Sequence, residues 1–309
     1  MYEVTIVGGG IAGCTAAIYA ARKRMNFLLI TKEFGGQFLE SGEILNYPGI
    51  VKTNGVEFRS IFEKQLAFNQ IKPKTGEEVK KIERAKEGLR VISDKASYET
   101  KTVIIATGSI PRKLNVPGEA EYANKGLTYC SVCDGPLFSG MDIAVIGGGN
   151  SALEGVDFTK DIAKKIYLVN INKEFNAHEY LIENITSYKN VEVISEAKTI
   201  EIIGDKFVNG LVYEKNNEKK RLDIGGVIIE IGRQPMTNFL EGFLALDEHR
   251  HIAADCQGRT SVEGVFAAGD CASSHEYQYT IAAGQGCTAL LKAARYIVNK
   301  VWKEDEADQ

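Results

Sequence analysis

The chain has 309 residues and a mass of 33.9 kDa, which is too long for one small core and suits two domains. Hydrophobic residues make up 44% and charged residues 25%, a composition typical of a globular protein. The formal net charge of −4 gives no electrostatic basis for binding nucleic acid or an anionic membrane.

The chain starts directly with a strand-like segment, residues 2–7, without a basic region and apolar run before it. We therefore expect no signal peptide and a cytoplasmic protein. No uninterrupted apolar stretch is long enough to span a bilayer, so no membrane association is expected.

A glycine turn, Gly8–Gly13, follows this strand and precedes a helix of small residues. Gly8 allows the turn, Gly10 removes a side chain from the path of a phosphate, and Gly13 lets the helix pack on the strand. With a strand before and a helix after, the pattern favours a dinucleotide site over a tight turn without ligand.

Two later segments, Val103–Gly108 and Gly264–Asp270, are apolar strands that end in small residues. Small residues at a strand end permit close approach of a cofactor. Asp270 would then accept a hydrogen bond from a ribityl hydroxyl, although capping of the next helix is an equally plausible role.

Cys130 and Cys133 form the one closely spaced cysteine pair, Cys-x-x-Cys. The other four cysteines (Cys14, Cys256, Cys271 and Cys287) are expected to be buried small hydrophobes. Without a second such pair or a histidine pair, and with only four histidines in the chain, no metal site is predicted.

The strand–turn–helix pattern repeats after the cysteine pair, and the second turn, Gly147–Ala152, lies 139 positions after the first. This offset indicates a duplicated nucleotide-binding fold. The elements predicted around it are strands at 142–146 and 166–169, a helix from Ala152 to Lys164, and β-rich segments at 191–194 and 226–231. The fold class is α/β with two Rossmann-like domains. Two such turns flanking a cysteine pair describe a flavoprotein that exchanges electrons with a dithiol.

The chain resembles the low-molecular-weight thioredoxin reductases over nearly its whole length. The motifs that carry the resemblance are Gly8–Gly13, Gly35–Gln37, Asn46–Gly49, Ala106–Gly108, Cys130–Asp134, Gly147–Ala152, Gly232–Pro235, Ala268–Asp270, and Gln278 before Ala283–Gly286. The resemblance implies a glutathione-reductase-type fold and a homodimer. It also implies an FAD domain in two parts, residues 1–113 and 245–309, with residues 114–244 inserted as the domain that carries the cysteine pair.

The resemblance also assigns roles to residues. The positions expected at FAD are Gly8, Gly10, Ile11, Ala12, Gly13, Thr31, Gly36, Gln37, Asn46, Ala106, Thr107, Gly108, Gly269, Asp270, Tyr277, Gln278 and Tyr279. Cys133 would lie nearest the flavin, and Cys130 would attack the disulfide of thioredoxin or a similar small protein. Asp134 would donate and accept the proton of the leaving thiolate, or cap a helix.

Two departures from the family pattern concern the electron donor and the flavin. Family members that use NADPH carry three arginines and a histidine where this chain has Asn170–Asn176, so the 2′-phosphate would meet little positive charge. Asn170 also offers no carboxylate for the ribose of NADH. Tyr277 and Tyr279 flank Gln278, where they would either stack on the flavin or pack in the ordinary way.

The leading hypothesis is therefore a thioredoxin reductase that resembles the ferredoxin-linked flavin enzymes, in which a flavin stores the first of two single electrons. An exposed basic segment, Arg22–Arg24, is a candidate docking patch for ferredoxin. An NADH- or NADPH-dependent reductase and an FAD dithiol oxidase that uses oxygen are the alternatives. A redox-sensing flavoprotein is disfavoured by the intact Cys130–Asp134 segment. Hydroperoxide-reductase flavoproteins are also disfavoured, because they carry an additional N-terminal dithiol module.

Overall fold

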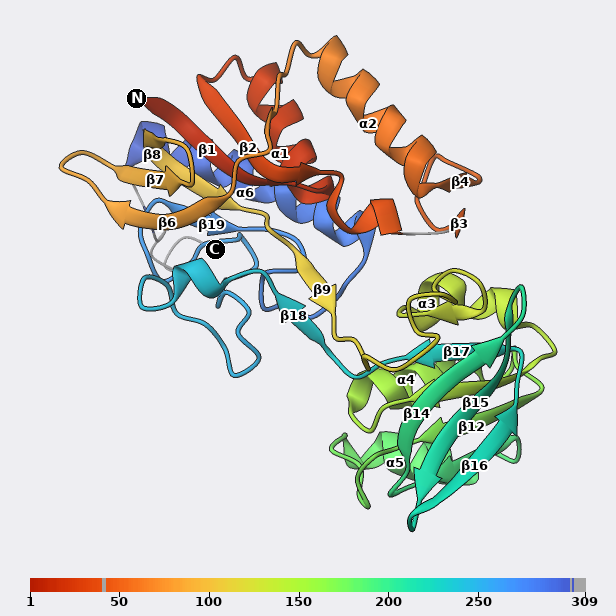
Figure 1. The fold of residues 1–309 in the computed structure, drawn as a ribbon. Coiled ribbons are helices and arrows are strands. Elements are labelled where there is room, and N and C mark those ends of the chain that lie inside the picture. The colour runs from red at the N-terminus through yellow and green to blue at the C-terminus, as the bar shows by residue number, and fades with distance from the viewer. Residues whose placement is uncertain (41–42, 301, 303–309) are drawn as a thin grey trace. The chain divides into compact units, whose positions relative to one another are not determined.

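The structure, a computed structural model, describes residues 1–40, 43–300 and 302 (Figure 1). Contacts divide the chain into unit 1, Met1–Ile110 with Gln234–Gln309, and unit 2, Pro111–Arg233. Unit 2 is thus inserted into unit 1, and the two chain crossings contain the paired strands β9 (Ser109–Pro111) and β18 (Arg233–Pro235).

The second boundary falls earlier than the 244/245 position expected from the sequence. Residues 234–244 belong to unit 1 because Leu240 and Leu244 are buried in its core, beside Val103 and Val265. Apolar packing, which no motif marks in this segment, sets the boundary.

Unit 1 is built on a seven-stranded sheet in the order β5-β2-β1-β8-β7-β6, with β19 paired to β8. Its strands are β1 (Tyr2–Gly9), β2 (Phe27–Phe34), β5 (Lys74–Thr75), β6 (Val79–Arg84), β7 (Leu89–Ser93), β8 (Ser97–Ile105) and β19 (Val265–Ala267). The strands β2, β1, β8 and β19 run parallel to one another, so their carboxyl ends meet at one edge, whereas β7 is antiparallel to β8.

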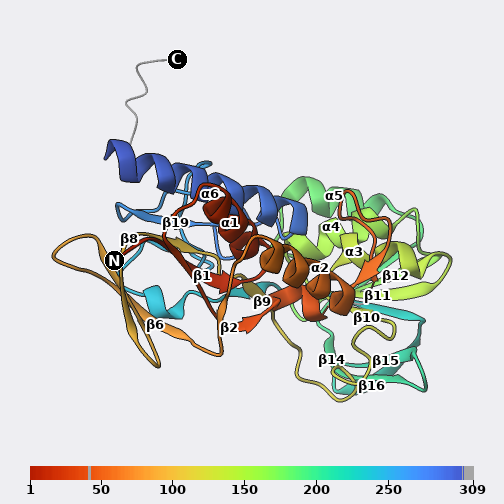
Figure 2. The same cartoon turned by 90° about the horizontal axis from the view of Figure 1, so that it is seen from above.

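Helices cover one face of this sheet. They are α1 (Ile11–Arg22), α2 (Gly55–Phe68) and α6 (Tyr279–Asn299), and α1 lies beside α6 (Figure 2). Small residues on α1 and α6, such as Ala16, Ala17 and Ala289, are fully buried and let the two helices and the sheet approach closely. The remaining short elements of unit 1 are η1 (Gly36–Glu40), β3 (Glu43–Ile44), β4 (Thr53–Asn54) and η3 (Asn238–Leu240).

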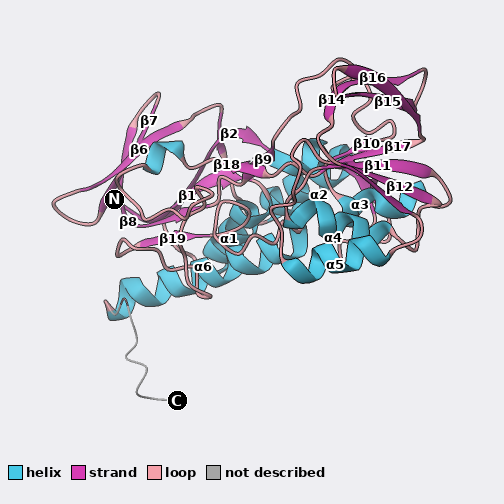
Figure 3. Cartoon of the chain, turned by 90° about the horizontal axis from the view of Figure 1, so that it is seen from below, coloured by secondary structure: helices cyan, strands magenta, loops and turns pink. Residues whose placement is uncertain are grey.

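Unit 2 has three layers, which Figure 3 shows as two groups of strands and a group of helices. The middle layer is a parallel sheet in the order β10-β17-β11-β12-β13. One face packs against helices and the other against an antiparallel sheet, β14-β15-β16. Bounds of these elements are β10 (Leu127–Thr128), β11 (Asp142–Ile146), β12 (Lys165–Val169), β13 (Val191–Ile194), β17 (Gly226–Ile229), β14 (Lys198–Gly204), β15 (Val208–Lys215), β16 (Glu218–Asp223), α3 (Ser131–Asp134), η2 (Gly135–Phe138), α4 (Asn150–Thr159) and α5 (Glu179–Ser187).

The predicted duplication is seen in the structure, because α1 begins at Ile11 and α4 begins at Asn150, again 139 positions later. The predicted helix to Lys164, however, is too long: α4 ends at Thr159. Beyond it, the Asn190 side-chain amide donates to the carbonyls of Lys160 and Ala163 at 2.8 and 3.3 Å. These carbonyls are therefore bonded outside the helix.

Candidate functional site

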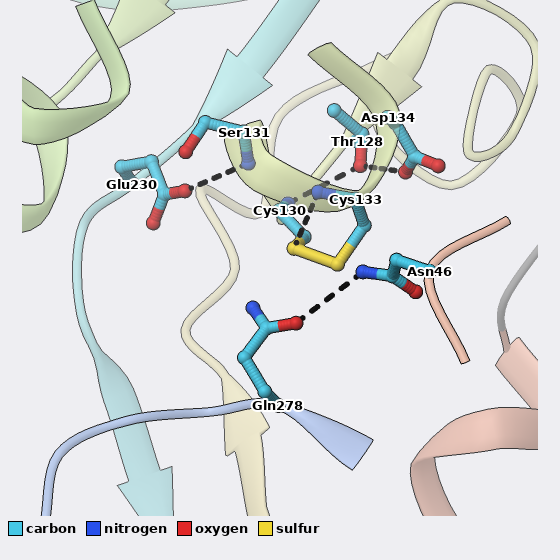
Figure 4. The surroundings of a disulfide bond; sticks show 8 residues. All are labelled: Asn46, Thr128, Cys130, Ser131, Cys133, Asp134, Glu230 and Gln278. Atoms are coloured by element: carbon cyan, nitrogen blue, oxygen red, sulfur yellow. Dashed lines mark hydrogen bonds between the residues drawn. A yellow bond between two sulfur atoms is a disulfide. The ribbon is translucent and has the colours of Figure 1, made fainter. Parts of the chain in front are cut away.

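The cysteine pair stands at the amino end of the one-turn helix α3. Cys130 is the N-cap residue, and its Sγ is bonded to Sγ of Cys133, with the two Cα atoms 5.3 Å apart (Figure 4). The spacing of three residues places both sulfurs on the same side of a single turn. Both cysteines are partly exposed.

Asp134, the last residue of α3, is tied to the chain just before the cysteines. The hydroxyl of Thr128 donates to Oδ2 of Asp134, and the same hydroxyl accepts the backbone N–H of Cys130 at 3.2 Å (Figure 4). Burial raises the pKa of Asp134, and the bond from Thr128 partly offsets this. Asp134 is the N-cap of η2, but its side chain makes no capping bond, so the expected helix-capping role is not observed.

Glu230 is a residue of this site that the sequence analysis missed. It follows β17, and its Oε1 accepts the backbone N–H of Ser131, the first residue of α3, at 3.2 Å (Figure 4). Burial raises the pKa of Glu230 to about 7, so it gains or loses a proton near neutral pH. The sequence feature that could have identified Glu230 is its position as the one acidic residue within the apolar run from Gly226 to Ile231.

The first glycine turn has the form that a dinucleotide phosphate requires. At Gly8, φ is +118° and an added Cβ would lie 2.1 Å from the carbonyl oxygen of Ala106; at Gly13 it would lie 1.9 Å from that of Gly8. An added Cβ at Gly10 would meet nothing within 4 Å. The turn therefore packs tightly behind Gly10 and is open in front of it. The first turn of α1 carries no acidic residue, which suits an anion.

Several other residues expected at the flavin gather at the same edge of the sheet. Ala106–Gly108 and Ala268–Asp270 follow the parallel neighbours β8 and β19, and the Ala268 N–H donates to Ile105 O at 2.9 Å. Gly269 lies against Ala12, with 3.1 Å from its added Cβ to Ala12 Cβ. Asp270 does not cap α6, because that helix begins nine positions later, at Tyr279.

The remaining expected flavin residues lie around this turn and before α6. Gly36 adjoins the turn, because its added Cβ would lie 3.6 Å from Gly10 Cα. Asn46 Nδ2 donates to Gln278 Oε1 at 3.3 Å (Figure 4). The Thr31 side chain fills the space beside Gly9, and Thr107 Oγ1 donates to the carbonyl of Met236 at 2.8 Å. Ile11 is buried at the start of α1 and Gln37 is half-buried in η1.

The two tyrosines that flank Gln278 make contacts of the packing kind. The Tyr277 hydroxyl lies 3.0 Å from Nε2 of His251, and the Tyr279 ring centroid lies 6.0 Å from that of Phe58. The partners in these contacts, His251 and Phe58, are not among the residues expected at the flavin, and stacking of either tyrosine on the flavin stays a prediction.

The second glycine turn is closely bonded to the loop that follows β12. An added Cβ at Gly148 would lie 2.3 Å from Oδ1 of Asn170, a buried side chain that also accepts the N–H of Asn172 at 3.2 Å. The N–H of Asn176 donates to the carbonyl of Gly148 at 2.8 Å. The exposed Lys173 is the single basic side chain of this loop, and Glu174 stands beside it. Asn170 is thus a structural residue that fixes the loop.

Two expectations are corrected by burial and position. Cys14 and Cys271 are fully buried as predicted, but Cys256 is exposed in a turn and Cys287 is half-buried. Arg22–Arg24 is exposed but lies at the carboxyl end of α1. A helix of 12 residues separates it from the glycine turn by about 18 Å. The basic segment therefore lies at the far end of the helix from the expected flavin residues.

The sequence profile of the pyridine nucleotide-disulphide oxidoreductase family matches residues 2–286. Among curated proteins, an NADH dehydrogenase of Bacillus subtilis (strain 168) is 39% identical over 299 residues, which are 96% of this chain and 59% of that protein. An alkyl hydroperoxide reductase component of Staphylococcus aureus (strain MSSA476) is 39% identical over 300 residues, with the same coverage. The chain thus spans 59% of the length of these relatives. Hydroperoxide-reductase flavoproteins, which were disfavoured as a function because of their additional module, are thus among the proteins similar to this chain.

Among solved structures, the thioredoxin reductase from Streptococcus pyogenes MGAS5005 aligns with a TM-score of 0.89 and 34% identity, over 96% of this chain and 98% of that one. A ferredoxin-flavin thioredoxin reductase from Clostridium acetobutylicum aligns with a TM-score of 0.54 and 30% identity, over 97% of this chain and 98% of that one. The predicted fold class is confirmed. Within residues 1–40, 43–300 and 302, no helix is long and apolar enough to cross a membrane.

Proposed function

This chain belongs to the pyridine nucleotide-disulphide oxidoreductase family, and on that premise we propose that it reduces the disulfide of thioredoxin or a similar small protein through Cys130 and Cys133. The observation that carries the proposal is the Cys130–Cys133 disulfide, partly exposed at the start of α3, with Asp134 beside it. Such a pair can accept two electrons and pass them on by thiol–disulfide exchange.

FAD is the cofactor of this chain, as in its thioredoxin reductase homologues. When bound, it supplies the two electrons that reduce the disulfide. The tight packing behind Gly10 and the open space in front of it fit the pyrophosphate. Gly36, Ala106 and Gly269, which gather at the same edge of the sheet, would line the rest of the site.

The reaction at the protein substrate needs both cysteines and one proton donor. The Cys130 thiolate attacks the substrate disulfide, so a mixed disulfide forms and the substrate S–S bond breaks. Asp134 gives its proton to the leaving thiolate. The Cys133 thiolate then attacks Cys130 Sγ, which releases the second substrate thiolate and re-forms the Cys130–Cys133 bond. The two electrons that the dithiol held have passed to the substrate.

For the electron donor we propose ferredoxin, with NADH as the second candidate. The loop after β12 offers a 2′-phosphate one lysine beside a glutamate, and Asn170 is a buried amide bonded within the loop. The low positive charge of the loop disfavours NADPH. The amide at Asn170 stands where a carboxylate would bind the ribose hydroxyl of NADH. NADH is favoured instead by the B. subtilis relative, which is named an NADH dehydrogenase.

An anaerobic titration of the yellow enzyme separates these donors. Portions are mixed with NADPH, NADH and chemically reduced ferredoxin while the flavin absorbance band is followed, and each is then supplied with oxidised thioredoxin. We expect reduced ferredoxin to bleach the band and thioredoxin to restore it. Bleaching by NADH alone would replace ferredoxin with NADH. Bleaching that thioredoxin and other small disulfides cannot reverse would contradict the proposed reductase.

A dithiol oxidase is tested on the same preparation. Oxygen consumption with reduced thioredoxin or a small dithiol is compared with and without the Cys133→Ser substitution. We expect consumption close to the rate without enzyme, because the proposed direction of electron flow is toward the disulfide. Rapid consumption that depends on Cys133 would reverse that direction.

A further inference from the structure

Three of the four histidines of the chain gather with an aspartate in unit 1. Asp247, His249 and His251 lie in one loop, and His275 lies in the segment between β19 and α6. The ring centroids of His251 and His275 are 4.5 Å apart. His275 Nε2 lies 3.0 Å from Asp247 Oδ2, and His251 Nδ1 lies 3.6 Å from Asp247 Oδ1.

Nδ1 of His251 is buried without a hydrogen-bond partner, and Oδ2 of Asp247, also buried, has the contact with His275 Nε2 at 3.0 Å as its close polar neighbour. Oδ1 of Asp247 already accepts the backbone N–H groups of His249 and His251, at 2.9 and 2.8 Å. The side chain of His251 is only 2% exposed, so water does not reach Nδ1 freely. A buried acceptor without a partner is unfavourable, and a cation between the three side chains would give the Nδ1 lone pair a partner.

The hydrogen-bond partner of the second ring nitrogen of His251 is also the kind found behind metal-binding histidines. Its second ring nitrogen, Nε2, lies 3.0 Å from the hydroxyl of Tyr277. A histidine that binds a metal through one nitrogen usually donates its other ring N–H to an oxygen atom. With the proton on Nε2, the lone pair of Nδ1 faces Asp247 and His275.

We propose that Asp247, His251 and His275 bind one divalent transition-metal ion of the zinc class. Their ligand atoms all lie within 4.8 Å of one another. Bonds of about 2.0–2.2 Å in a tetrahedral site place ligand atoms roughly 3.3 Å apart, so a small contraction completes the geometry. Two imidazoles and one carboxylate suit zinc and neighbouring metals, with water as the fourth ligand.

The ion would fix the segment that leads into α6. A contact between backbones already joins the two stretches, because the N–H of Ile252 donates to Cys271 O at 2.8 Å. The metal would add a second connection at His275, three positions before Gln278. Tyr277 and Gln278, two of the residues expected at the flavin, would then be held by the metal ligand His275 on one side and by the start of α6 on the other. No metal was expected, because the chain has only four histidines and no second cysteine pair; His251 and His275, 24 positions apart, meet only in the fold.

The test uses the complete oxidised flavoprotein, with its free thiols alkylated so that cysteine does not bind metal. Zn²⁺ is titrated by calorimetry, and Co²⁺ is titrated while its visible bands are followed beyond the flavin absorbance. The variants are Asp247→Asn and His275→Gln, whose side chains are partly exposed and therefore compatible with folding. His249→Gln is the matched control, because His249 lies in the same loop outside the triad.

We expect one Zn²⁺ per chain, and a higher melting temperature with Zn²⁺ than without it. Asp247→Asn and His275→Gln should each weaken binding by roughly tenfold or more and remove the thermal shift, whereas His249→Gln should change neither. Absence of stoichiometric Zn²⁺ or Co²⁺ binding, or unchanged binding in His275→Gln, would overturn the site. Equal losses in His249→Gln and His275→Gln would overturn the assignment of its ligands.

Discussion

Cys130 and Cys133 belong to the same helical turn but differ in their position relative to the helix. Cys130 is the N-cap, outside the helix, and the exposed Val132 follows it closely. Cys133 lies inside the helix, with its N–H directed to Cys130 Sγ at 3.2 Å. The outer position favours Cys130 as the sulfur that attacks a protein substrate.

Replacing Cys130 with serine should therefore stop thioredoxin reduction while FAD stays bound. Cys133 then remains as a free thiol that cannot transfer two electrons alone. We expect the thioredoxin-dependent rate to fall to background and the flavin spectrum to change, because one thiol persists. Rates are measured with the donor in excess. Full activity would show that Cys133, or another thiol, is the attacking group.

Asp134 is placed to hold a proton because burial raises the pKa of its carboxyl. The protonated form, which is the proton donor, persists to higher pH than in an exposed aspartate and is lost as the pH rises through the raised pKa. Asp134→Asn should lower the rate of disulfide reduction on the order of a hundredfold and remove that falling limb of the pH profile. Thr128→Ser keeps the hydroxyl and is the control. A pH profile unchanged in Asp134→Asn would assign the proton to another group.

Glu230 links pH to stability with a definite sign. Its pKa is about 7 in the folded chain and near the ordinary 4.5 when unfolded, so between these values the folded state binds more protons. The free energy of unfolding should therefore fall as the pH rises from about 4.5 to 7. Glu230→Gln, which keeps the acceptor for Ser131, should remove this slope and be more stable at pH 8 by on the order of 2 kcal/mol. The exposed Glu183→Gln serves as the control, and an equal change in both variants would contradict the assignment.

At the scale of elements, the glycine turn of unit 1 contains one glycine that is packed against a side chain and one, Gly10, that is expected to face the pyrophosphate. An added Cβ at Gly9 would lie 2.8 Å from Thr31 Cγ2, whereas at Gly10 it would meet nothing. Gly9→Ala should lower the stability of the protein on the order of 1–3 kcal/mol through overpacking. Gly10 has extended backbone that alanine adopts, so Gly10→Ala should change the stability of FAD-free protein by less than about 0.5 kcal/mol.

The same Gly10→Ala variant should nevertheless retain FAD poorly, because its methyl group enters the space assigned to the pyrophosphate. Flavin content after gel filtration and unfolding of the FAD-free proteins measure the two effects separately. Normal flavin content in Gly10→Ala would mean that the pyrophosphate does not approach this position.

How far the elements could be predicted depended on whether their residues carry a local pattern. The buried strands β1 and β11 and the glycine turns were found because apolar runs and glycines mark them directly. The sheet β14–β16 was missed: five of the six residues of β16 are exposed, and the strand is held by pairing with β15. Pairing between strands leaves little trace in a single strand of this kind.

The residues of the candidate site likewise fall into those that a local sequence pattern reveals and those that it does not. Cys130, Cys133 and Asp134 lie within five consecutive positions; the spacing indicated the cysteine pair, and the family resemblance gave Asp134 its role. Glu230 lies 99 positions from Ser131, and only the register of β17 beside β11 and β10 brings it to α3. The histidine cluster of unit 1 was hidden for the same reason. Residues from distant segments meet through tertiary packing, which a single sequence does not display.

At the scale of the whole molecule, the electron donor is either a protein that docks, ferredoxin, or the small molecule NADH. Transient docking of an acidic iron–sulfur protein depends on charge, so ferredoxin-driven reduction of thioredoxin should slow as salt is added. The position of Arg22–Arg24, about 18 Å along α1 from the glycine turn, argues against this segment as the docking patch. We therefore expect the double substitution Arg22→Ala with Lys23→Ala to leave the ferredoxin-driven rate and its salt dependence unchanged.

The measurement compares wild type and this double variant in steady-state thioredoxin reduction at several salt concentrations, with chemically reduced ferredoxin as the donor. A control with a small uncharged reductant separates docking from the later disulfide exchange, since that reductant needs no charged surface. If the ferredoxin reaction alone is slower in the double variant, the carboxyl end of α1 is the docking patch, contrary to our expectation. Electrons would then have to travel the length of α1 to reach the glycine turn. If salt affects neither reaction, steering by charge plays no part, and NADH becomes the stronger candidate for the donor.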